Sequence, residues 1–354
     1  MTSLALILAA TITAQPLTNA DVLEPSVRNE VDHALSVMPT NSVAVSEAAV
    51  AFAALFATNG LNATERAIAL ISSQKQGRWF WQGAEVTPVA ARLLRRAADL
   101  PEPPLRLAIF SSHVEQIARQ ENLSLAAAAQ KVKALGYSGV SEMEGLSPAS
   151  ADTLRKAGLA TACVIGFTNF ERHYDERQCA NLIARARAAD CRQIMLVPGF
   201  YPDTTNHAET LRTIVARTNR FAAEASRHGI ETIIEDFDNE TSPTCGIGRL
   251  TEFLSAAPSV GFTYDTGNFS GTGGKPTDGM ALLGRLRHLH LKDRPAADSA
   301  KTVAVGAGIV PMSQIITAVR DVGYDGWFTV ELFGVTNMLR CAEASAAFLK
   351  SGQF

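Results

Sequence analysis

The sequence has few cysteines, and they form no pattern that could support a disulfide-based fold. Five are scattered over 354 residues, and none of their spacings matches a zinc knuckle or a redox pair. An odd number also leaves one thiol without a partner. These observations exclude a disulfide framework, so we expect a reduced, cytoplasmic setting. The cysteines are Cys163, Cys179, Cys191, Cys245 and Cys341.

An excess of positive charge is also missing. Lys and Arg number 32 against 35 Asp and Glu, which leaves a net charge of −3. The basic residues form no stripe, so the sequence argues against nucleic acid or an anionic membrane as a partner. The densest basic group, Arg92, Arg95 and Arg96, is expected on the solvated face of one helix.

A hydrophobic run long enough to span a membrane is absent as well. The apolar segment Leu4–Ala14 is too short to cross a bilayer. It could form the apolar part of a signal peptide, but no Lys or Arg precedes Arg28, as such a signal requires. We favour a buried first helix capped by Thr2 or Ser3, while a signal peptide at residues 1–14 stays open.

The composition is typical of a globular protein, since 47% of the residues are hydrophobic and 19% are charged. Residues 1–100 are interpreted as a helical accessory region. The segment Leu100–Leu105 (LPEPPL) marks its end, because adjacent prolines cannot continue a helix. Two tryptophans in Gln74–Gly83 are interpreted as packing at a helix end. Apolar residues at helical spacing predict helices at 29–38, 47–56, 64–74 and 89–99.

Residues 105–354 alternate between strand-like and helix-like segments. Eight such units match an α/β fold of the (β/α)₈ TIM barrel type. A doubly wound open sheet is the alternative, but no glycine-rich phosphate turn opens its first helix. Strands are predicted at 106–110, 139–142, 162–165, 193–197, 232–235, 261–265, 288–292 and 327–332. Helices are predicted near 123–135, 149–157, 176–189, 208–228, 247–256, 278–286, 312–322 and 339–350.

Four residues at the ends of successive predicted strands suggest a metal site: Glu235, Asp265, His290 and Glu331. Residues at the carboxyl ends of barrel strands point into a common mouth, so they can converge there. Three carboxylates and one imidazole suit one divalent ion, with Mn²⁺, Mg²⁺ or Co²⁺ favoured and Zn²⁺ also compatible.

Nearby polar residues are candidates for contact with a substrate. Lys292 shares a strand face with His290, so it should reach the mouth and bind a substrate oxygen or a carboxylate such as Asp293 or Glu235. Glu142 or Glu144, at the end of the second strand, is a further candidate.

Other polar residues near the strand ends are expected to support the site. We expect His288 to point away from the barrel interior, opposite to His290, and to pack or to support the site from outside it. His113 is expected to be structural, and Asp236 and Asp238 are loop acids that could support the metal ligands.

Several segments of the sequence resemble those of a known family. The segments from about residue 105 to 350 resemble the sugar phosphate isomerase/epimerase group of xylose isomerase-like barrels. No single segment is diagnostic, but their order and spacing together are a strong signal. The matching segments are GYSGVSEME, GIETIIEDFDN, DTGNF, HLHLKDR, the Gly306 and Gly308 turn, and GYDGWFTVEL.

The resemblance implies that Glu235, Asp265, His290 and Glu331 bind one divalent metal. It also implies that Glu235 and Glu331 exchange protons with a sugar or sugar phosphate through an enediolate. A metal that chelates two neighbouring oxygens would stabilise the charge that develops as the proton leaves carbon. Proton return to the opposite face gives epimerisation, and return to the neighbouring carbon gives isomerisation.

Two positions depart from the family pattern. Asn268 stands where the ketose epimerases carry a substrate-binding histidine, and Ala296 stands where they carry an arginine. Asn268 can still bind a hydroxyl or carbonyl, and Lys292 or Arg294 can replace the arginine in binding substrate. The substrate therefore does not follow from the resemblance.

The leading prediction is a metal-dependent sugar isomerase or epimerase, with a homo-oligomer compatible with it. A metal-dependent polyol dehydratase and a non-catalytic carbohydrate-binding barrel are the alternatives. An apurinic endonuclease is disfavoured, because its chemistry needs more histidines at the strand ends and a basic surface.

Overall fold

The computed structural model describes residues 23–39, 44–202 and 207–352. The segment Leu4–Ala14 lies outside these ranges, so the buried helix and the signal peptide both remain predictions. No helix within the described ranges is long and apolar enough to cross a membrane. Contacts divide the chain into two compact units, one of Met1–Pro104, Met280–Leu286 and Gln314–Gly326, and one of Leu105–Gly279, Arg287–Ser313 and Trp327–Phe354.

The first unit contains the four helices that the apolar spacing predicts. They begin where local signals place them: Asn62 and Glu65 form a reciprocal capping box at the start of α4, and Pro88 lies in the first turn of α5. The helices are α2 (Pro25–Ser36), α3 (Glu47–Thr58), α4 (Ala63–Ser72) and α5 (Thr87–Ala97).

The tryptophan-rich segment is a hairpin, and the expectation of a helix end was wrong. Strands β1 (Phe80–Trp81) and β2 (Ala84–Glu85) pair in antiparallel fashion, with Gln82 and Gly83 at positive φ in the turn. Trp79 is buried, and its indole N–H donates to the carbonyl of Leu70 at 2.6 Å. Trp79 therefore packs, as the sequence analysis expected.

The arginines of α5 are not simply solvated, contrary to expectation. The Arg92 side chain is 11% exposed and pairs with Asp321 at 3.1 Å and with Glu102 at 3.1 Å. Arg96 pairs with the same Asp321 carboxylate at 2.5 Å, and Arg320 pairs with Glu102 at 3.1 Å. Burial, together with the neighbouring Arg96, lowers the pKa of Arg92 to about 10. Sequence alone could not show this cluster, since Asp321 lies over 200 residues from α5.

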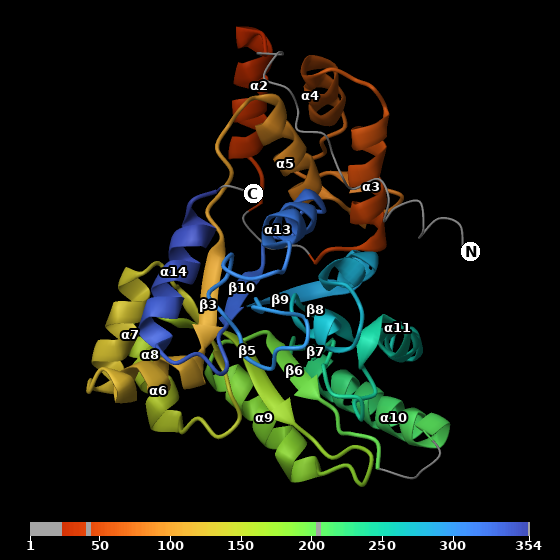
Figure 1. Ribbon diagram of the computed structural model, residues 1–354. Coiled ribbons are helices and arrows are strands. Elements are labelled where there is room, and N and C mark those ends of the chain that lie inside the picture. The colour runs from red at the N-terminus through yellow and green to blue at the C-terminus, as the bar shows by residue number, and fades with distance from the viewer. Residues whose placement is uncertain (1–22, 40–43, 203–206, 353–354) are drawn as a thin grey trace. The chain divides into compact units, whose positions relative to one another are not determined.

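The second unit is a closed barrel of eight parallel strands, which confirms the predicted fold (Figure 1). Pairing of the last strand with the first, Trp327 with Arg106 through Val330 with Ile109, closes it. The eight strands, all at or within two residues of the predicted positions, are β3 (Arg106–Phe110), β4 (Gly139–Glu142), β5 (Ala160–Phe167), β6 (Gln193–Val197), β7 (Glu231–Glu235), β8 (Gly261–Asp265), β9 (Leu286–Lys292) and β10 (Trp327–Glu331).

Helices follow the strands in the order that the sequence predicts, with three differences. The segment after β3 is helical and was missed, because only Val114 and Ile117 mark its apolar face. A short helix, α12, was also missed, and residues 276–285 form a 3₁₀ helix with a kink at Leu282. The helices are α6 (Ser111–Gln120), α7 (Leu125–Ala134), α8 (Pro148–Lys156), α9 (Glu176–Ala188), α10 (His207–Ser226), α11 (Gly246–Ala256), α12 (Asn268–Gly271), η1 (Pro276–Arg285), α13 (Met312–Asp321) and α14 (Met338–Lys350).

The barrel interior is filled mainly by apolar side chains on one side. Alternate residues of each strand point inward, and those of β3, β5, β6 and β7 form a buried cluster against which Met143 packs. The cluster consists of Phe110, Cys163, Ile165, Met195 and Ile233. A packed interior of this kind leaves the carboxyl ends of the strands as the place for a site.

We expect Asp321→Asn to lower the free energy of unfolding by about 1–3 kcal/mol, because two arginines then lose a largely buried ionic partner. Chemical denaturation measures this change. Asp152→Asn is the matched control: its partner Lys156 is 78% exposed, so no measurable change is expected. Equal losses in both variants would contradict the role of the cluster.

Candidate metal centre

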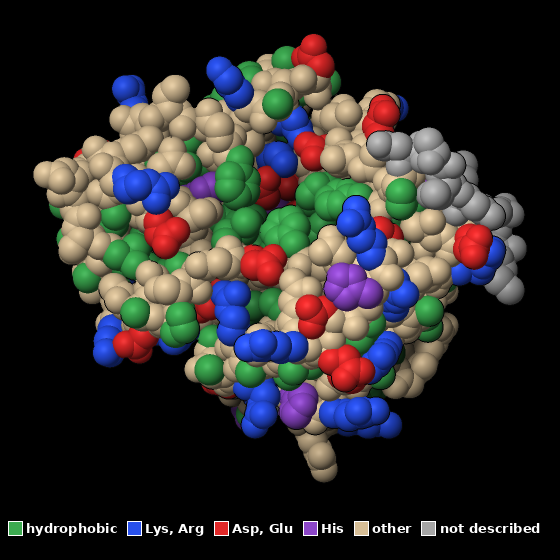
Figure 2. All heavy atoms as spheres, turned by 90° about the horizontal axis from the view of Figure 1, so that it is seen from below, with side chains coloured by type: hydrophobic (Ala, Val, Ile, Leu, Met, Phe, Trp, Pro, Cys, Tyr) green, Lys and Arg blue, Asp and Glu red, His purple; other side chains and the backbone are tan. Residues whose placement is uncertain are grey.

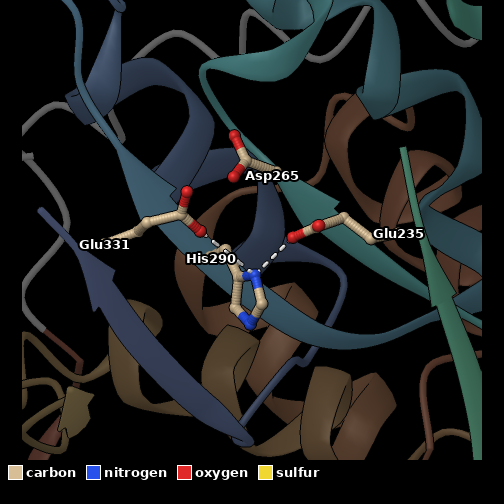
Figure 3. Close-up of side chains that lie close together, drawn as sticks. All are labelled: Glu235, Asp265, His290 and Glu331. Atoms are coloured by element: carbon tan, nitrogen blue, oxygen red, sulfur yellow. Dashed lines mark hydrogen bonds and ion pairs between the residues drawn. The ribbon is translucent and has the colours of Figure 1, made fainter. Parts of the chain in front are cut away.

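The four predicted ligand residues converge at the carboxyl ends of adjacent strands (Figure 3). Glu235 ends β7, Asp265 ends β8, His290 lies near the end of β9 and Glu331 ends β10. Each contributes one potential ligand atom, and these atoms all lie within 4.8 Å of one another. All four residues are buried. On the face of the molecule that Figure 2 shows, acidic side chains lie at the bottom of a hollow bordered by apolar side chains.

His290 presents one ring nitrogen to two carboxylates. Its Nδ1 is hydrogen-bonded to the carboxylate of Glu235 and lies 3.6 Å from Oε2 of Glu331. The other ring nitrogen, Nε2, and Oδ2 of Asp265 are buried and have no hydrogen-bond partner. One ring proton cannot satisfy three crowded carboxylates. The donor set therefore fits a hard divalent cation coordinated by three oxygens and one nitrogen.

The electrostatics of the cluster support the same conclusion. Burial and the neighbouring Glu331 raise the pKa of Glu235, although His290 and Lys292 act in the opposite direction. Burial and the two glutamates raise the pKa of Asp265 well above its usual range, although Lys292 acts in the opposite direction. Burial also disfavours the charged form of Glu331, but Lys292 and His290 outweigh it and lower its pKa. The pKa values of the two glutamates are thus shifted in opposite directions. The site also holds more negative charge than its own cations balance.

Lys292 reaches the mouth, as its strand position predicts, and pairs with Glu331. Its Nζ lies 2.9 Å from Oε1 of Glu331 and 3.8 Å from Oδ2 of Asp265. It also donates to Oδ1 of Asn268 at 2.7 Å. The expected alternative partners, Asp293 and Glu235, are not the ones it contacts. The carboxylates of Glu331 and Asp265 hold the pKa of Lys292 above its usual value despite burial.

Asp265 is oriented by backbone groups and by Asp236. The amides of Gly267 and Asn268 donate to its Oδ1 at 2.7 and 2.9 Å, which leaves Oδ2 directed to the cluster. The Asp265 amide donates to Oδ1 of Asp236 at 2.9 Å, and Asn268 donates from Nδ2 to the Asp236 carbonyl at 2.6 Å. Asp236 and Asn268 therefore hold the β8 end in place, the supporting role expected for a loop acid.

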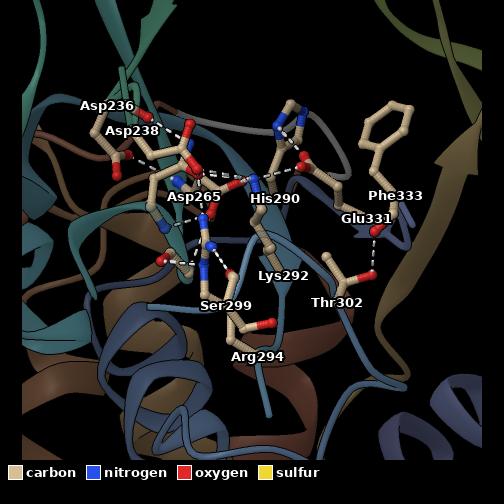
Figure 4. A network of polar contacts seen from close by, with 12 residues as sticks. Asp236, Asp238, Asp265, His290, Lys292, Arg294, Ser299, Thr302, Glu331 and Phe333 are labelled. Carbon is tan, nitrogen blue, oxygen red and sulfur yellow. Dashed lines mark hydrogen bonds and ion pairs between the residues drawn. The ribbon is translucent and has the colours of Figure 1, made fainter. Parts of the chain in front are cut away.

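Arg294 is buried among acceptors and does not face the four ligands (Figure 4). Its Nε donates to the carbonyl of Gly267 at 2.9 Å, and its terminal nitrogens contact the carboxylate of Asp238 and the carbonyl of Ser299. The side chain thus ties together three loops at the mouth. The side chain is only 2% exposed in this arrangement, so the direct contact with substrate that the sequence analysis expected stays a prediction.

Asp293 has a role that the sequence analysis missed. Its Oδ2 accepts from the amides of Gly306 and Gly308, each at 2.9 Å, and its Oδ1 accepts from Val310 at 3.1 Å. A Cβ on Gly308 would lie 2.2 Å from the Asp293 carboxylate, so glycine is required there. The Gly-x-Gly turn was the feature of the sequence that could have indicated this role, since its glycines let two backbone amides approach one buried carboxylate.

Glu142 does not join the cluster, and its assignment as a substrate ligand is corrected. Its neighbour Ser141 bonds inside the barrel to Thr329, so Glu142 points outward. There its carboxylate pairs with Arg155 at 3.2 Å and with Arg185 at 3.7 Å. The position of Glu142 at a strand end was predicted correctly. The alternation of side chains along the strand, however, decides whether a residue points into the barrel or away from it.

The expectation for His288 was wrong for the same geometrical reason. His288 and His290 are two residues apart on β9, so both rings lie inside the barrel, with centroids 5.2 Å apart. His288 bonds Gln193 at 3.0 Å and Thr329 at 2.9 Å below the cluster. Burial, together with His290, lowers its pKa well below the usual value, which keeps the ring neutral.

His113 is structural, as expected. Its Nε2 accepts from the amide of Leu332 at 2.9 Å, which fixes the backbone beside Glu331. Burial lowers the pKa of His113 to about 4, although Glu331 acts in the opposite direction. A neutral acceptor is what this hydrogen bond requires.

The sequence of residues 129–352 matches the model of the family described as xylose isomerase-like TIM barrel. A comparison with curated proteins found no match. The matched segment includes all four residues of the cluster and the strands β4 to β10.

Solved structures similar to this chain have the same barrel fold. One is a probable 3-DHS dehydratase, AsbF, from Bacillus anthracis, 17% identical, covering 69% of this chain and 98% of its own, with a TM-score of 0.57. Another is a sugar phosphate isomerase/epimerase from Parabacteroides distasonis, 16% identical, with coverages of 71% and 96% and a TM-score of 0.55. A third, IOLI protein with a bound zinc atom, is 13% identical, with coverages of 71% and 99% and a TM-score of 0.57.

Purified protein is expected to bind about one divalent ion per chain, and His290→Ala or Glu331→Gln should weaken that binding by at least roughly tenfold. Elemental analysis and titration with Mn²⁺, Co²⁺ and Zn²⁺ measure this. Glu121→Gln is the control, because Glu121 is exposed and lies outside the cluster. Wild-type protein without metal after loading with each ion would contradict the site.

Lys292→Met should tighten metal binding by roughly three- to tenfold, because the lysine ammonium competes with the ion for Glu331 and Asp265. Competitive titration with a chelator measures the change. Lys156→Met, on the exposed surface of α8, should leave the affinity unaltered. Weaker binding in Lys292→Met would show that Lys292 supports the ion instead of competing with it.

Proposed function

Because this chain belongs to the xylose isomerase-like TIM barrel family, we propose that it is a divalent-metal-dependent isomerase or epimerase of a hydroxyketone of the sugar class. The observation that carries the proposal is the buried cluster of three carboxylates and one imidazole. Solved structures with the same barrel fold include a sugar phosphate isomerase/epimerase and a protein with a bound zinc atom.

Glu235, Asp265, His290 and Glu331 would hold the ion. A divalent ion there supplies electrophilic assistance, since it stabilises the negative charge that develops on two neighbouring substrate oxygens when a proton leaves carbon. This assistance is needed, because a proton next to a carbonyl or hydroxyl is only weakly acidic.

The two glutamates divide the proton transfer between them. Glu331 is held ionised by Lys292 at 2.9 Å, which suits removal of the carbon-bound proton. Glu235 faces the same centre and is hydrogen-bonded to Nδ1 of His290, which suits it to return a proton to the intermediate. Delivery to the opposite face of the same carbon inverts that centre. Delivery to the neighbouring carbon exchanges the carbonyl and hydroxyl positions.

Lys292 and Asn268 are the proposed groups that bind the substrate beside the glutamates. The ammonium of Lys292 can donate to a substrate oxygen while it remains paired with Glu331, and Asn268 holds Lys292 in that position. Arg294 supports the same loops by donating hydrogen bonds to the carbonyl of Gly267 and the carboxylate of Asp238. Its proposed part is to shape the mouth, not to touch the substrate.

A metal-dependent dehydratase is the second candidate, favoured by the structural similarity to a probable dehydratase. Such a reaction starts with the same removal of a proton next to a carbonyl. The electron pair of that C–H bond then forms a double bond as the hydroxyl on the neighbouring carbon leaves with a proton from an acid. Glu331 as base and Glu235 as acid would serve this reaction as well.

The proposal predicts exchange of a carbon-bound proton. Metal-loaded protein in D₂O should incorporate deuterium next to the carbonyl of a hydroxyketone, as detected by NMR. Glu331→Gln and Glu235→Gln should each lower the exchange rate by about 10²- to 10⁴-fold, the contribution typical of a positioned acid or base. Glu121→Gln, at an exposed position, should retain the wild-type rate. Metal-loaded wild-type protein that exchanges no proton in any ketose, ketose phosphate or cyclic hydroxyketone would refute the function.

A further inference from the structure

The ring of His290 lacks the hydrogen bond that usually orients a histidine ligand of a metal. Its Nδ1 faces the carboxylates of Glu235 and Glu331 (Figure 3). In metal sites of proteins, the other ring nitrogen usually donates to an acceptor that sets the orientation of the ring. Nε2 of His290 is buried and has no hydrogen-bond partner among the described residues. The orientation of this ring must therefore be set in another way.

Two neighbouring rings hold the plane of the His290 imidazole. The Phe110 ring lies 4.9 Å from it between centroids, with the two planes at 62°, and the His288 ring lies at 5.2 Å, with the planes at 88°. Both are the edge-to-face arrangement that aromatic rings favour. Because the barrel interior is closely packed, rotation of the imidazole would drive it into these neighbours. The rings thus fix its plane, and the carboxylates determine which nitrogen faces an ion.

His288 is itself held at both of its ring nitrogens. Gln193 donates from Nε2 to the carbonyl of Arg287 at 2.8 Å, which leaves its Oε1 for Nδ1 of His288 at 3.0 Å. Since Oε1 can only accept, Nδ1 carries a proton. On the other side, Nε2 of His288 bonds to the Thr329 hydroxyl at 2.9 Å, and that hydroxyl bonds to Ser141 at 3.1 Å. These bonds link β4, β10, β9 and β6 through the barrel interior.

This network is buried below the metal centre and belongs to no other site of the protein described above. Ser141, His288 and Thr329 are each 0% exposed. A buried polar network whose members are all bonded is rigid, and it specifies one arrangement of its side chains. A phenylalanine in place of His288 could supply a ring, but not the two hydrogen bonds that set the plane of that ring. The histidine therefore combines a packing surface with fixed anchors.

We propose that His288 is a positioning residue of the metal centre: its hydrogen bonds fix its own ring, and its ring fixes the plane of His290. It does not touch the ion or the substrate. This inference rests on the proposed function in one respect, since it requires His290 to coordinate a divalent ion through Nδ1. When the network is broken, the His290 ring gains freedom to tilt, and Nδ1 is no longer held in the direction of the ion.

Two threonines of the barrel interior provide a matched pair of variants. Thr329 precedes Glu331 by two residues and Thr263 precedes Asp265 by two, so each lies below a ligand on the inward face of its strand. Both are 0% exposed. The Thr329 hydroxyl anchors His288, whereas Oγ1 of Thr263 has no hydrogen-bond partner in the described part of the chain. Replacement by valine removes the same hydroxyl from each and keeps the branched shape.

We expect Thr329→Val to weaken Zn²⁺ binding by about three- to tenfold, the effect of losing roughly one edge-to-face ring contact. Thr263→Val should leave the affinity unaltered. Gln193→Met removes the anchor at the other ring nitrogen of His288 and should act like Thr329→Val. Competitive titration with a chelator measures the affinity, and chemical denaturation shows that each variant is folded.

NMR of Zn²⁺-loaded protein with ¹⁵N-labelled histidine separates positioning from a loss of stability. In the wild type, His290 should coordinate through Nδ1 and carry its proton on Nε2, and His288 should carry its proton on Nδ1. The signal of the coordinated nitrogen should shift or broaden in Thr329→Val and in Gln193→Met. It should keep its wild-type position in Thr263→Val.

Equal Zn²⁺ affinity in Thr329→Val and in the wild type would overturn the positioning role. A loss of affinity that is as large in Thr263→Val, or that leaves the His290 signal unchanged, would overturn it as well. Wild-type protein that binds no ion would overturn both this inference and the proposed function. Wild-type protein that binds the ion and shows these effects, but exchanges no carbon-bound proton, would refute the proposed function and leave the positioning role supported.

Discussion

Closure of the barrel by the pairing of β10 with β3 is the constraint on which the site depends. This pairing closes the sheet into a ring, within which β7, β8, β9 and β10 are successive neighbours whose carboxyl ends meet. Four side chains spread over about a hundred residues of sequence are thereby forced within 4.8 Å of one another. Without closure, the strand ends would splay and the acids would have no reason to share one space.

The negative charge that is concentrated there is partly balanced by nearby cations, and further polar groups hold these charged side chains in place. Lys292 and His290 face the carboxylates directly. Behind them, backbone amides and Asp236 hold Asp265, and Asn268 holds Lys292. His113 and His288 are kept neutral by burial and act as fixed hydrogen-bonding groups. The residual excess of acid is compatible with the divalent cation that we propose for this site.

The acidic cluster and the apolar interior cluster come largely from different strands of the barrel. The metal ligands come from β7 to β10, whereas the apolar interior cluster comes from β3, β5, β6 and β7. The oxygen-rich groups and the apolar side chains therefore lie mainly on different sides of the barrel.

The sequence by itself determined the barrel, its eight strands and the four residues of the metal centre, because short apolar runs, turns and strand-end acids are local signals. It also placed Lys292 in the mouth, since strand alternation is local. Only the tertiary structure decided that Glu142 is bound by Arg155 and Arg185, that Arg294 is occupied by loop carbonyls, and that Asp321 pairs with α5. The reason is physical: a pattern shows which face a residue occupies, but its ionic partner depends on which distant segment folds against it.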